Sequence, residues 1–343
     1  MIKVSIVKNG DLKEWDRYVE NHPEGCVFQT SAWRDVVHLT YGHQPFYLTA
    51  ERDSKVCGVL PLFLIDSFLF GRVLATCPYA SMGAICADDE ESSRALVQKA
   101  IGLARELKVR YTELKSTKIT TSEELQRHTD YVNYYIPLHE PDVMWNTQFE
   151  KNAKKKVRQA EKLGLTLARG HHLLDAFYHM LALNMRRLGT PVHSRLYYQN
   201  ILNLFGSRAD IFVAQYQDIP VAGVILIRYR NEVVSLMGVS RDDYFHVRPN
   251  NFLYWEVLKA SYHSGATRYD FGRSLAGSGP AEFKESWGAE SRPLYYEFFL
   301  NRQKTIPRVH QGNPRYQLYQ SAWKRLPLRL TTWLGPRLIK DIP

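Results

Sequence analysis

The chain has 343 residues, of which 45% are hydrophobic and 13% aromatic, and its formal net charge is +10. This length predicts about two domains, and this composition supplies enough apolar side chains for large cores, which excludes a mostly disordered protein. The N-terminal M-I-K-V-S-I-V is typical of a strand and lacks the apolar core of a signal peptide. The most apolar run, 59–70, contains Pro61 and Asp66 and is too short to span a bilayer, so we expect a cytoplasmic protein.

The cysteines show neither C-x-x-C pairing nor the spacing of a metal site. We therefore expect reduced, buried thiols and no bound metal. The four cysteines are Cys26, Cys57, Cys77 and Cys86.

A faint internal repeat organises the chain up to residue 300. Residues 46–63 and 211–227 each read as a strand, a polar turn and a V-x-G-V strand, with Gly58 or Gly223 at the same point. This spacing predicts a β-hairpin with one buried face. In each half a predicted helix then precedes a strand that begins with Arg-Tyr. The helices are 91–107 and 251–264, and the strands are 110–114 and 268–271.

Two copies of one α/β unit with helical crossovers account for this repeat, and a chance similarity between two amphipathic segments is the alternative. We expect an N-terminal domain at 1–145, a C-terminal domain at 146–300 and a tail at 301–343.

The second domain is expected to begin with a basic helix at 147–163. Its apolar positions step by three or four residues, which predicts an amphipathic helix that ends at Gly164. Its other face is either a contact surface for phosphate or nucleic acid, such as a tRNA acceptor stem, or simply a solvated face. The six cations of that face are Lys151, Lys154, Lys155, Lys156, Arg158 and Lys162. A second helix at 173–187 and a G-T-P-V-H-S-R segment follow, before a further helix at 196–205.

Residues 269–290 form the segment richest in chemical signals. The strand at 268–271 enters a Gly-rich turn that brings Arg273, Ser274 and Lys284 into a small space. Two fixed cations beside exposed backbone N–H groups suit an anionic substrate or a developing oxyanion, and a surface loop with incidental charges is the alternative. Around Leu114–Ser116, the matching place in the first half, we expect no such cation.

The C-terminal tail carries most of the net charge. Nine lysines and arginines stand against Asp341 alone, which gives the tail +8 of the net +10. Tryptophans and leucines between these cations are typical of a segment that lies on an anionic membrane surface. The alternative is a tail that packs on the body of the protein with its charges solvated.

Taken together, several motifs resemble the FemAB family, whose members carry two GNAT-type acyltransferase domains. The chain is most similar to the subgroup associated with PEP-CTERM/exosortase exopolysaccharide systems. The resemblance covers residues 1 to 300 and rests on Q29-T-S-A-W, K154-K-K-V-R-Q-A-E-K-L-G-L, R187-L-G-T-P-V-H-S, V221-A-G-V, R248-P-N-N-F-L-Y-W, D270-F-G-R-S and F283-K-E-S-W-G-A-E.

The resemblance implies an α/β fold with mixed sheets, made of two tandem GNAT-like acyltransferase domains and a basic tail. It implies an N-acyltransferase or aminoacyltransferase that moves an acyl or aminoacyl group from an activated carrier to an amine of a cell-envelope or exopolysaccharide precursor. The carrier is aminoacyl-tRNA or acyl-CoA, and no bound cofactor is expected. A non-catalytic binding module that is recruited to the membrane surface is the alternative.

The family's Phe-Lys pair falls on Phe283 and Lys284, and the resemblance implies that Lys284 stabilises charge at the reacting ester or the leaving tRNA. Asp270 and His193 are the candidate bases, although each also has a structural interpretation. The sequence lacks the CoA-binding loop of other GNAT enzymes, because 240–252 contains no glycine. The start of the following helix is nevertheless a candidate phosphate site. The candidate substrate-binding residues are Arg273, Ser274, Arg195, Arg187, Trp287, Gln29 and Trp33, and those for donor phosphate are Arg248 and Asn250.

Overall fold

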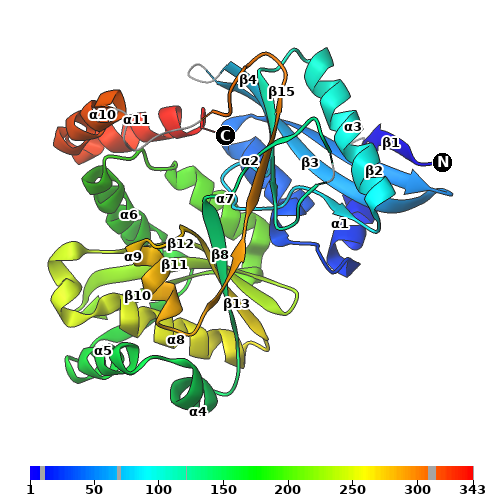
Figure 1. Cartoon of the computed structure of the whole chain (residues 1–343). Coiled ribbons are helices and arrows are strands. Elements are labelled where there is room, and N and C mark those ends of the chain that lie inside the picture. Colours follow the sequence, from blue (N-terminus) through cyan, green and yellow to red (C-terminus); the bar gives the residue numbers. More distant parts are fainter. Residues whose placement is uncertain (8–11, 68–70, 121, 308–313, 343) are drawn as a thin grey trace. The chain divides into compact units, whose positions relative to one another are not determined.

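The computed structural model describes residues 1–7, 12–67, 71–120, 122–307 and 314–342 (Figure 1). The chain divides into two compact units. The first contains Met1–Tyr131, Pro293–Val309 and Leu338–Pro343, and the second contains Val132–Arg292 and His310–Arg337. This division differs from the three consecutive segments expected, because a strand that follows the second unit in sequence pairs in the sheet of the first.

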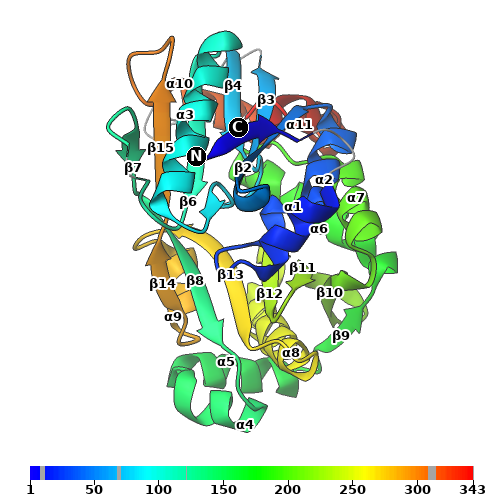
Figure 2. The same ribbon diagram turned by 90° about the vertical axis from the view of Figure 1, so that its right-hand side faces the viewer.

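The first unit is built on an eight-stranded mixed sheet of order β1-β2-β3-β4-β6-β15-β7, with β5 paired to β3. Helix α3 (Glu90–Glu106) packs on one face, and α1 (Leu12–Asn21) and α2 (Ser31–Tyr41) lie on the other (Figure 2). The strands are β1 (Lys3–Ile6), β2 (Gln44–Arg52), β3 (Lys55–Ser67), β4 (Gly71–Thr76), β5 (Cys86–Ala87), β6 (Tyr111–Ser116), β7 (Gln126–His128) and β15 (Tyr295–Leu300).

Alternation along β2 and β3 explains how both faces of this sheet are buried. Leu48, Leu60 and Leu62 join the core beneath α3. Tyr47, one residue before Leu48, instead packs on Trp15 of α1. Successive side chains of a strand point to opposite faces, so strands that are apolar at nearly every position bind helices on both sides.

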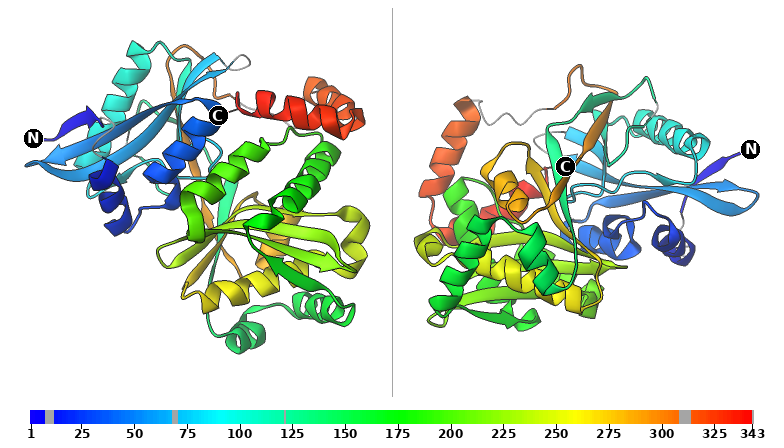
Figure 3. Two further views of the ribbon diagram at one scale, coloured as in Figure 1. Left: turned by 180° about the vertical axis from the view of Figure 1, so that it is seen from behind. Right: turned by 60° about the horizontal axis from the view of Figure 1, so that its bottom comes forward.

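The second unit is built on a seven-stranded sheet of order β14-β8-β13-β12-β11-β10-β9. Helix α8 (Pro249–His263) contacts β10 and β11 and carries α5 (Lys151–Lys162) on its outer side, whereas α6 (Leu174–Leu188) packs against β11 and β12 (Figure 3). The strands are β8 (Tyr131–Pro137), β9 (Thr166–Arg169), β10 (Ala209–Tyr216), β11 (Ile219–Tyr229), β12 (Glu232–Ser240), β13 (Arg268–Leu275) and β14 (Glu290–Pro293). The shorter helices are α4 (Pro141–Val143), α7 (Arg195–Phe205) and α9 (Gly279–Glu285).

The two hairpins of the predicted repeat are confirmed, and their geometry agrees closely. The β2–β3 turn has positive φ at Asp53 and Ser54, and the β10–β11 turn has positive φ at Gln217 and Asp218. Two successive left-handed residues are typical of the turns that match the twist of a tight hairpin. Each hairpin also has a register shift just before its turn, between Ala50 and Glu51 in one and between Ala214 and Gln215 in the other.

The basic helix begins later than the periodicity predicted. Residues Met144–Gln148 form a π-helix and Phe149 is extended, so α5 begins at Lys151. The extended backbone turns the ring of Phe149 inward, where it packs edge-on against Trp255 and Trp287. The buried face of α5 is nevertheless the predicted one, with Ala153, Val157 and Ala160.

The tail forms two helices, α10 (Pro314–Arg325) and α11 (Leu328–Ile339). One face of them packs on the second unit: α10 contacts α6, and Trp323 is buried. The packing alternative therefore holds for that face, and membrane contact by the other face remains a hypothesis. No helix among the described residues combines the length and the hydropathy that crossing a bilayer requires.

Candidate functional site

The candidate site lies where two parallel strands of the second unit part. Pairing between β12 and β13 covers only three residue pairs, from Glu232↔Arg268 to Val234↔Asp270. Beyond it β12 continues to Ser240 beside β11, and β13 continues to Leu275. The carboxyl ends of parallel strands that diverge in this way are a common place for ligands in open α/β sheets.

Asp270, the last paired residue of β13, is a buried carboxyl at this point. It accepts hydrogen bonds from Nδ2 of Asn133, at 2.7 Å, and from the backbone N–H of Gly272, at 2.6 Å. Burial raises the pKa of Asp270 to about 7, and the nearby charge of Glu232 adds to this effect. The two donated hydrogen bonds and the positive charge of Lys284 act against the rise in the Asp270 pKa.

Lys284 lies on α9 and is also buried, with 8% of its surface exposed. Its Nζ donates to the carbonyl oxygens of Gly272, at 2.7 Å, and Arg273, at 3.0 Å. Burial lowers the pKa of Lys284 to about 8, and the charge of Asp270 opposes this lowering. The prediction that the Gly-rich turn and Lys284 share one small space is confirmed.

The turn reaches Lys284 because Gly272 has a left-handed backbone, with φ of 75°. This conformation costs a residue with a Cβ atom about 1–2 kcal/mol and suits glycine. It directs two successive carbonyls at one ammonium group. An ammonium has three N–H donors, so a protonated Lys284 keeps one for a further acceptor.

Two residues that sequence reasoning missed come from β8. Asn133 is fully buried and holds Asp270. The ring of Tyr134 lies 5.5 Å from Nζ of Lys284, and its hydroxyl donates to Glu285, the neighbour of Lys284 on α9. No sequence signal identifies them, because they stand 137 and 151 residues away from their partners.

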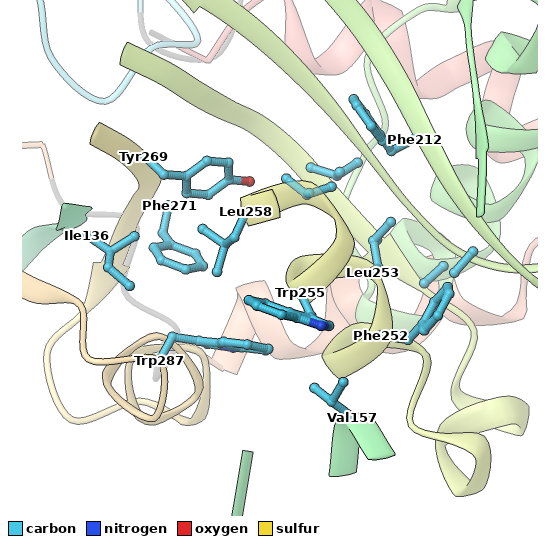
Figure 4. Close-up of a cluster of buried hydrophobic side chains, with 14 of the residues drawn as sticks. Ile136, Val157, Phe212, Phe252, Leu253, Trp255, Leu258, Tyr269, Phe271 and Trp287 are labelled. Carbon is cyan, nitrogen blue, oxygen red and sulfur yellow. The ribbon is translucent and has the colours of Figure 1, made fainter. Parts of the chain in front are cut away.

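The end of α9 adjoins a cluster of buried hydrophobic residues that includes Trp255, Phe271 and Trp287 (Figure 4). Trp287 is fully buried against Phe149, and Phe283 packs between Tyr254 and Trp287. The expectation that Trp287 binds substrate is corrected here: its ring fills the core, and no part of it is exposed. Phe283, a candidate catalytic residue, is half-buried and fixes the position of the helix that carries Lys284.

Three other candidates of this unit have contact partners other than Asp270 and Lys284. His193 precedes α7 and stacks on Tyr197, with ring centres 4.5 Å apart, and burial lowers the pKa of His193 to about 3. Arg195 forms an ion pair with Asp175, and Arg187 lies 3.4 Å from Asp242. Both arginines are exposed, as is Arg273, whereas Ser274 is buried on β13.

Gln29 and Trp33 are corrected from substrate-binding to structural residues of the first unit. The side chain of Gln29 is buried, donates to the carbonyl of Ala84 and accepts from the backbone N–H of Cys26. Trp33 is 1% exposed and packs edge-on against Phe28. Family motifs mark core residues as well as site residues, and the contacts that each side chain makes separate the two.

The expectation of no cation at the matching place in the first unit is wrong. Lys115 on β6 is buried, and its Nζ lies 3.6 Å from Glu113. The repeat contained this signal, since R-Y-T-E-L-K-S at 110–116 matches R-Y-D-F-G-R-S at 268–274. Here the backbone N–H of Lys115 donates to Oγ1 of Thr76, and its carbonyl accepts from the N–H of Ala84.

Arg248 and Asn250 stand at the start of α8. Arg248 has a left-handed backbone, with φ of 60°, and its Nε donates to Gln159 of α5. Asn250 follows Pro249 in the first turn, where backbone N–H groups lack partners within the helix. The start of α8 therefore adjoins the basic helix α5, and both present positive or partially positive groups.

Comparisons with known proteins bear on the fold and on the class of enzyme. Residues 147–285 match the acetyltransferase (GNAT) domain family. The lipid II:glycine glycyltransferase of Staphylococcus epidermidis is 20% identical over 88% of this chain and 94% of its own, and that of Staphylococcus aureus is 21% identical over the same shares.

Among solved structures, FemX superposes with a TM-score of 0.68 at 18% identity, over 93% of this chain and all of its own. The C-terminal domain of a putative lysylphosphatidylglycerol synthetase from Agrobacterium fabrum has a TM-score of 0.56 at 12% identity, over 84% of this chain and 91% of its own. The chain thus has a tandem GNAT fold with two mixed sheets and is an acyl- or aminoacyltransferase. The similarity to the glycyltransferases also supports the resemblance to the FemAB family.

Proposed function

We propose that this protein is a FemAB-like transferase that forms an amide bond on a cell-envelope or exopolysaccharide precursor of the PEP-CTERM/exosortase kind. It moves an aminoacyl group from an activated carrier to an amine of that precursor, at the cytoplasmic face of the membrane. The observation that carries the proposal is the buried Lys284, held by two carbonyls at the point where β12 and β13 part. The glycyl transfer to lipid II named for its relatives supports the acceptor class.

In the proposed reaction the acceptor amine attacks the carbonyl carbon of the carrier ester. The C–N bond forms as the carbonyl electron pair moves to oxygen, which gives a tetrahedral oxyanion. The remaining N–H of Lys284 donates to this oxyanion or to the leaving oxygen. A preorganised donor of this kind accelerates acyl transfer by about 10²–10³-fold. Collapse breaks the bond to the carrier oxygen, which takes a proton while the new amide nitrogen loses one.

We assign Asp270 to positioning rather than to proton transfer. Its carboxyl is buried and engaged by Asn133 and Gly272. When it is ionised, its charge opposes the effect of burial and raises the pKa of Lys284. His193, on the α6–α7 side of the unit, is not assigned a part in the reaction.

For the donor we favour aminoacyl-tRNA over acyl-CoA. The segment before α8 contains no glycine, and it forms a 3₁₀ helix at Asp242–Val247 with a non-glycine left-handed residue, Arg248. A glycine-rich phosphate cradle is therefore not formed. The adjoining α5 exposes Lys151, Lys155 and Lys162, and none of the three pairs with a carboxylate within the described ranges. Such a surface suits the phosphate backbone of an RNA.

For the acceptor we propose Arg187, Arg195 and Arg273 as clamps for a phosphate or carboxylate. All three are exposed. Arg187 and Arg195 each reach one exposed carboxylate, Asp242 and Asp175, which an anionic substrate could replace at little cost because exposed ion pairs are weak.

The test is mass spectrometry of envelope polysaccharide from a deletion strain complemented with variants. The wild-type gene restores an amide-linked group that the deletion strain lacks, and Lys284→Met restores less than about a hundredth of it per unit time. Lys259→Met, which removes a part-buried lysine paired with Glu256 on α8, is the matched control and restores it fully. A folded Lys284→Met protein with full transfer refutes the role of Lys284, and an unchanged polysaccharide in the deletion strain refutes the proposed function.

A further inference from the structure

The tail helices come very close to the second unit at two glycines, Gly335 of α11 and Gly189 of the second unit. On α11 the buried residues are Thr331 and Gly335, one helical turn apart. A Cβ atom on Gly335 would stand 2.8 Å from the carbonyl oxygen and 2.9 Å from the backbone nitrogen of Val192. On α10, Gln320 comes equally close to Gly189, at the other end of the same turn. The close approach therefore requires glycine on one side of each contact.

Several large apolar residues of these helices face outward, although Trp323 of α10 is buried. Trp333 is 56% exposed and Leu318 is 73% exposed, and Leu330 and Tyr319 are also exposed. A helix that only packs on a soluble protein buries its large apolar residues and exposes its polar ones. On α11, Thr331 and Gly335 are buried whereas Leu330 and Trp333 reach solvent, so packing on the body does not account for these two exposed side chains.

The same outward surface is uniformly cationic. Lys324, Arg325, Arg329 and Arg337 are exposed on α10 and α11, and neither helix contains an acidic residue. The guanidinium of Arg337 lies 4.2 Å above the ring of Trp333, which places a charge directly beside an apolar group. Tryptophan and leucine beside arginine are the residues that enter the headgroup region of an anionic bilayer.

We propose that α10 and α11 form a docking surface for an anionic lipid bilayer. Leu318, Leu330 and Trp333 enter the interface, and the four cations contact lipid phosphates. The turn from Gly189 to Val192, on which both helices rest, lies between Arg187 and Arg195, the residues proposed above to hold the acceptor. The use of this placement, to bring a membrane-borne acceptor to the two arginines, rests on the proposed function. The binding of lipid does not rest on it.

Vesicle co-sedimentation of the full-length protein tests the proposal. Vesicles of phosphatidylglycerol and phosphatidylcholine in equal parts bind the protein, and vesicles of phosphatidylcholine alone bind it weakly. Arg329→Gln combined with Arg337→Gln weakens binding to the anionic vesicles about thirtyfold, because each cation near such a surface contributes about fivefold. Leu330→Ser combined with Trp333→Ser weakens it at least about tenfold. Leu39→Ser, at an exposed leucine of α2, is the matched control and leaves binding unchanged.

Equal binding by the wild type and both tail variants overturns the proposal. The same samples distinguish two other occupants of this surface. Binding of RNA without binding of vesicles identifies RNA as the occupant and overturns the proposal. A dimer that dissociates only in the tail variants identifies a second copy of the chain as the occupant and also overturns the proposal. The vesicle assay contains no donor or acceptor, so its result does not depend on transfer activity. Vesicle binding by a protein that transfers no aminoacyl group therefore refutes the proposed function alone. Loss of vesicle binding with intact transfer refutes this inference alone.

Discussion

Replacing Asp270 by asparagine tests the electrostatics of the site without any substrate. Burial raises the pKa of Asp270 from 3.8 to about 7, so the folded protein retains a proton that the unfolded chain releases. As the pH rises from about 4 to about 7, Asp270 ionises in the unfolded chain but largely keeps its proton in the folded protein. This ionisation lowers the free energy of the unfolded chain alone. The stability that this group contributes is therefore present below about pH 4 and is lost as the pH rises through about 7.

The size of the effect follows from the two pKa values of Asp270. Ten-fold steps in proton concentration correspond to about 1.4 kcal/mol each. Between about pH 5 and about pH 7 the wild type should lose roughly 2 kcal/mol of unfolding free energy relative to Asp270→Asn. The asparagine retains an oxygen that accepts from Asn133 and Gly272, so the hydrogen bonds of the site are kept in the comparison.

Urea unfolding followed by tryptophan fluorescence, at a series of pH values, provides the measurement. Asp175→Asn is the control, because Arg195 lowers the pKa of this exposed carboxyl. The stability contributed by Asp175 is present at neutral pH and is lost as the pH falls, which is the opposite sign. If the difference between Asp270→Asn and the wild type is the same at about pH 5 and about pH 7, the reasoning about the buried carboxyl is refuted.

Two further predictions concern the turn and the basic helix. Gly272→Ala should lower stability by about 1–2 kcal/mol and also reduce transfer, because it moves a carbonyl that holds Lys284. Gly277→Ala, at a similar φ of 71° with no atom near its Cβ position, should lower stability alone, and equal losses of transfer in both would contradict this account. Changing Lys151, Lys155 and Lys162 together to glutamine should reduce the salt dependence of tRNA binding by a slope of about 2, measured by filter binding. The same change at the exposed Lys3, Lys13 and Lys55 of the first unit should leave the slope intact, and an unaltered slope in the α5 variant would remove that helix from the RNA contact.

The hairpins could be predicted from the sequence because their determinants are local. The two-residue periodicity of each strand and the polar turns at Asp53–Ser54 and Gln217–Asp218 lie within about twenty residues of one another. The unit boundaries could not, because β15 pairs with β6 across more than half of the chain. Pairing at that separation leaves no periodic signal at either end.

The residues of the candidate site also divide into those that could be predicted from the sequence and those that could not. Lys284 follows Gly272 by 12 residues and Arg273 by 11, and a glycine-rich turn between two regular elements already brings their carbonyls close to it. Asn133 and Tyr134, which complete the site, belong to a strand that no motif connects with it. Trp287 and Gln29 were misassigned because a motif does not indicate whether its aromatic or amide side chain faces the core.

The sequence by itself determined the tandem α/β architecture, the turn that holds Lys284 and the excess of charge in the tail, since each depends on residue type and short-range spacing. Only the tertiary structure decided that Asp270 and Lys284 are buried together, because residues distant in the sequence exclude water from them. The pKa values of both groups follow from this burial. The tertiary structure also decided which face of the tail packs on the second unit. Composition specifies how many apolar and charged side chains a helix carries, whereas close contact with a neighbour, as at Gly335 and Val192, determines which of them remain exposed.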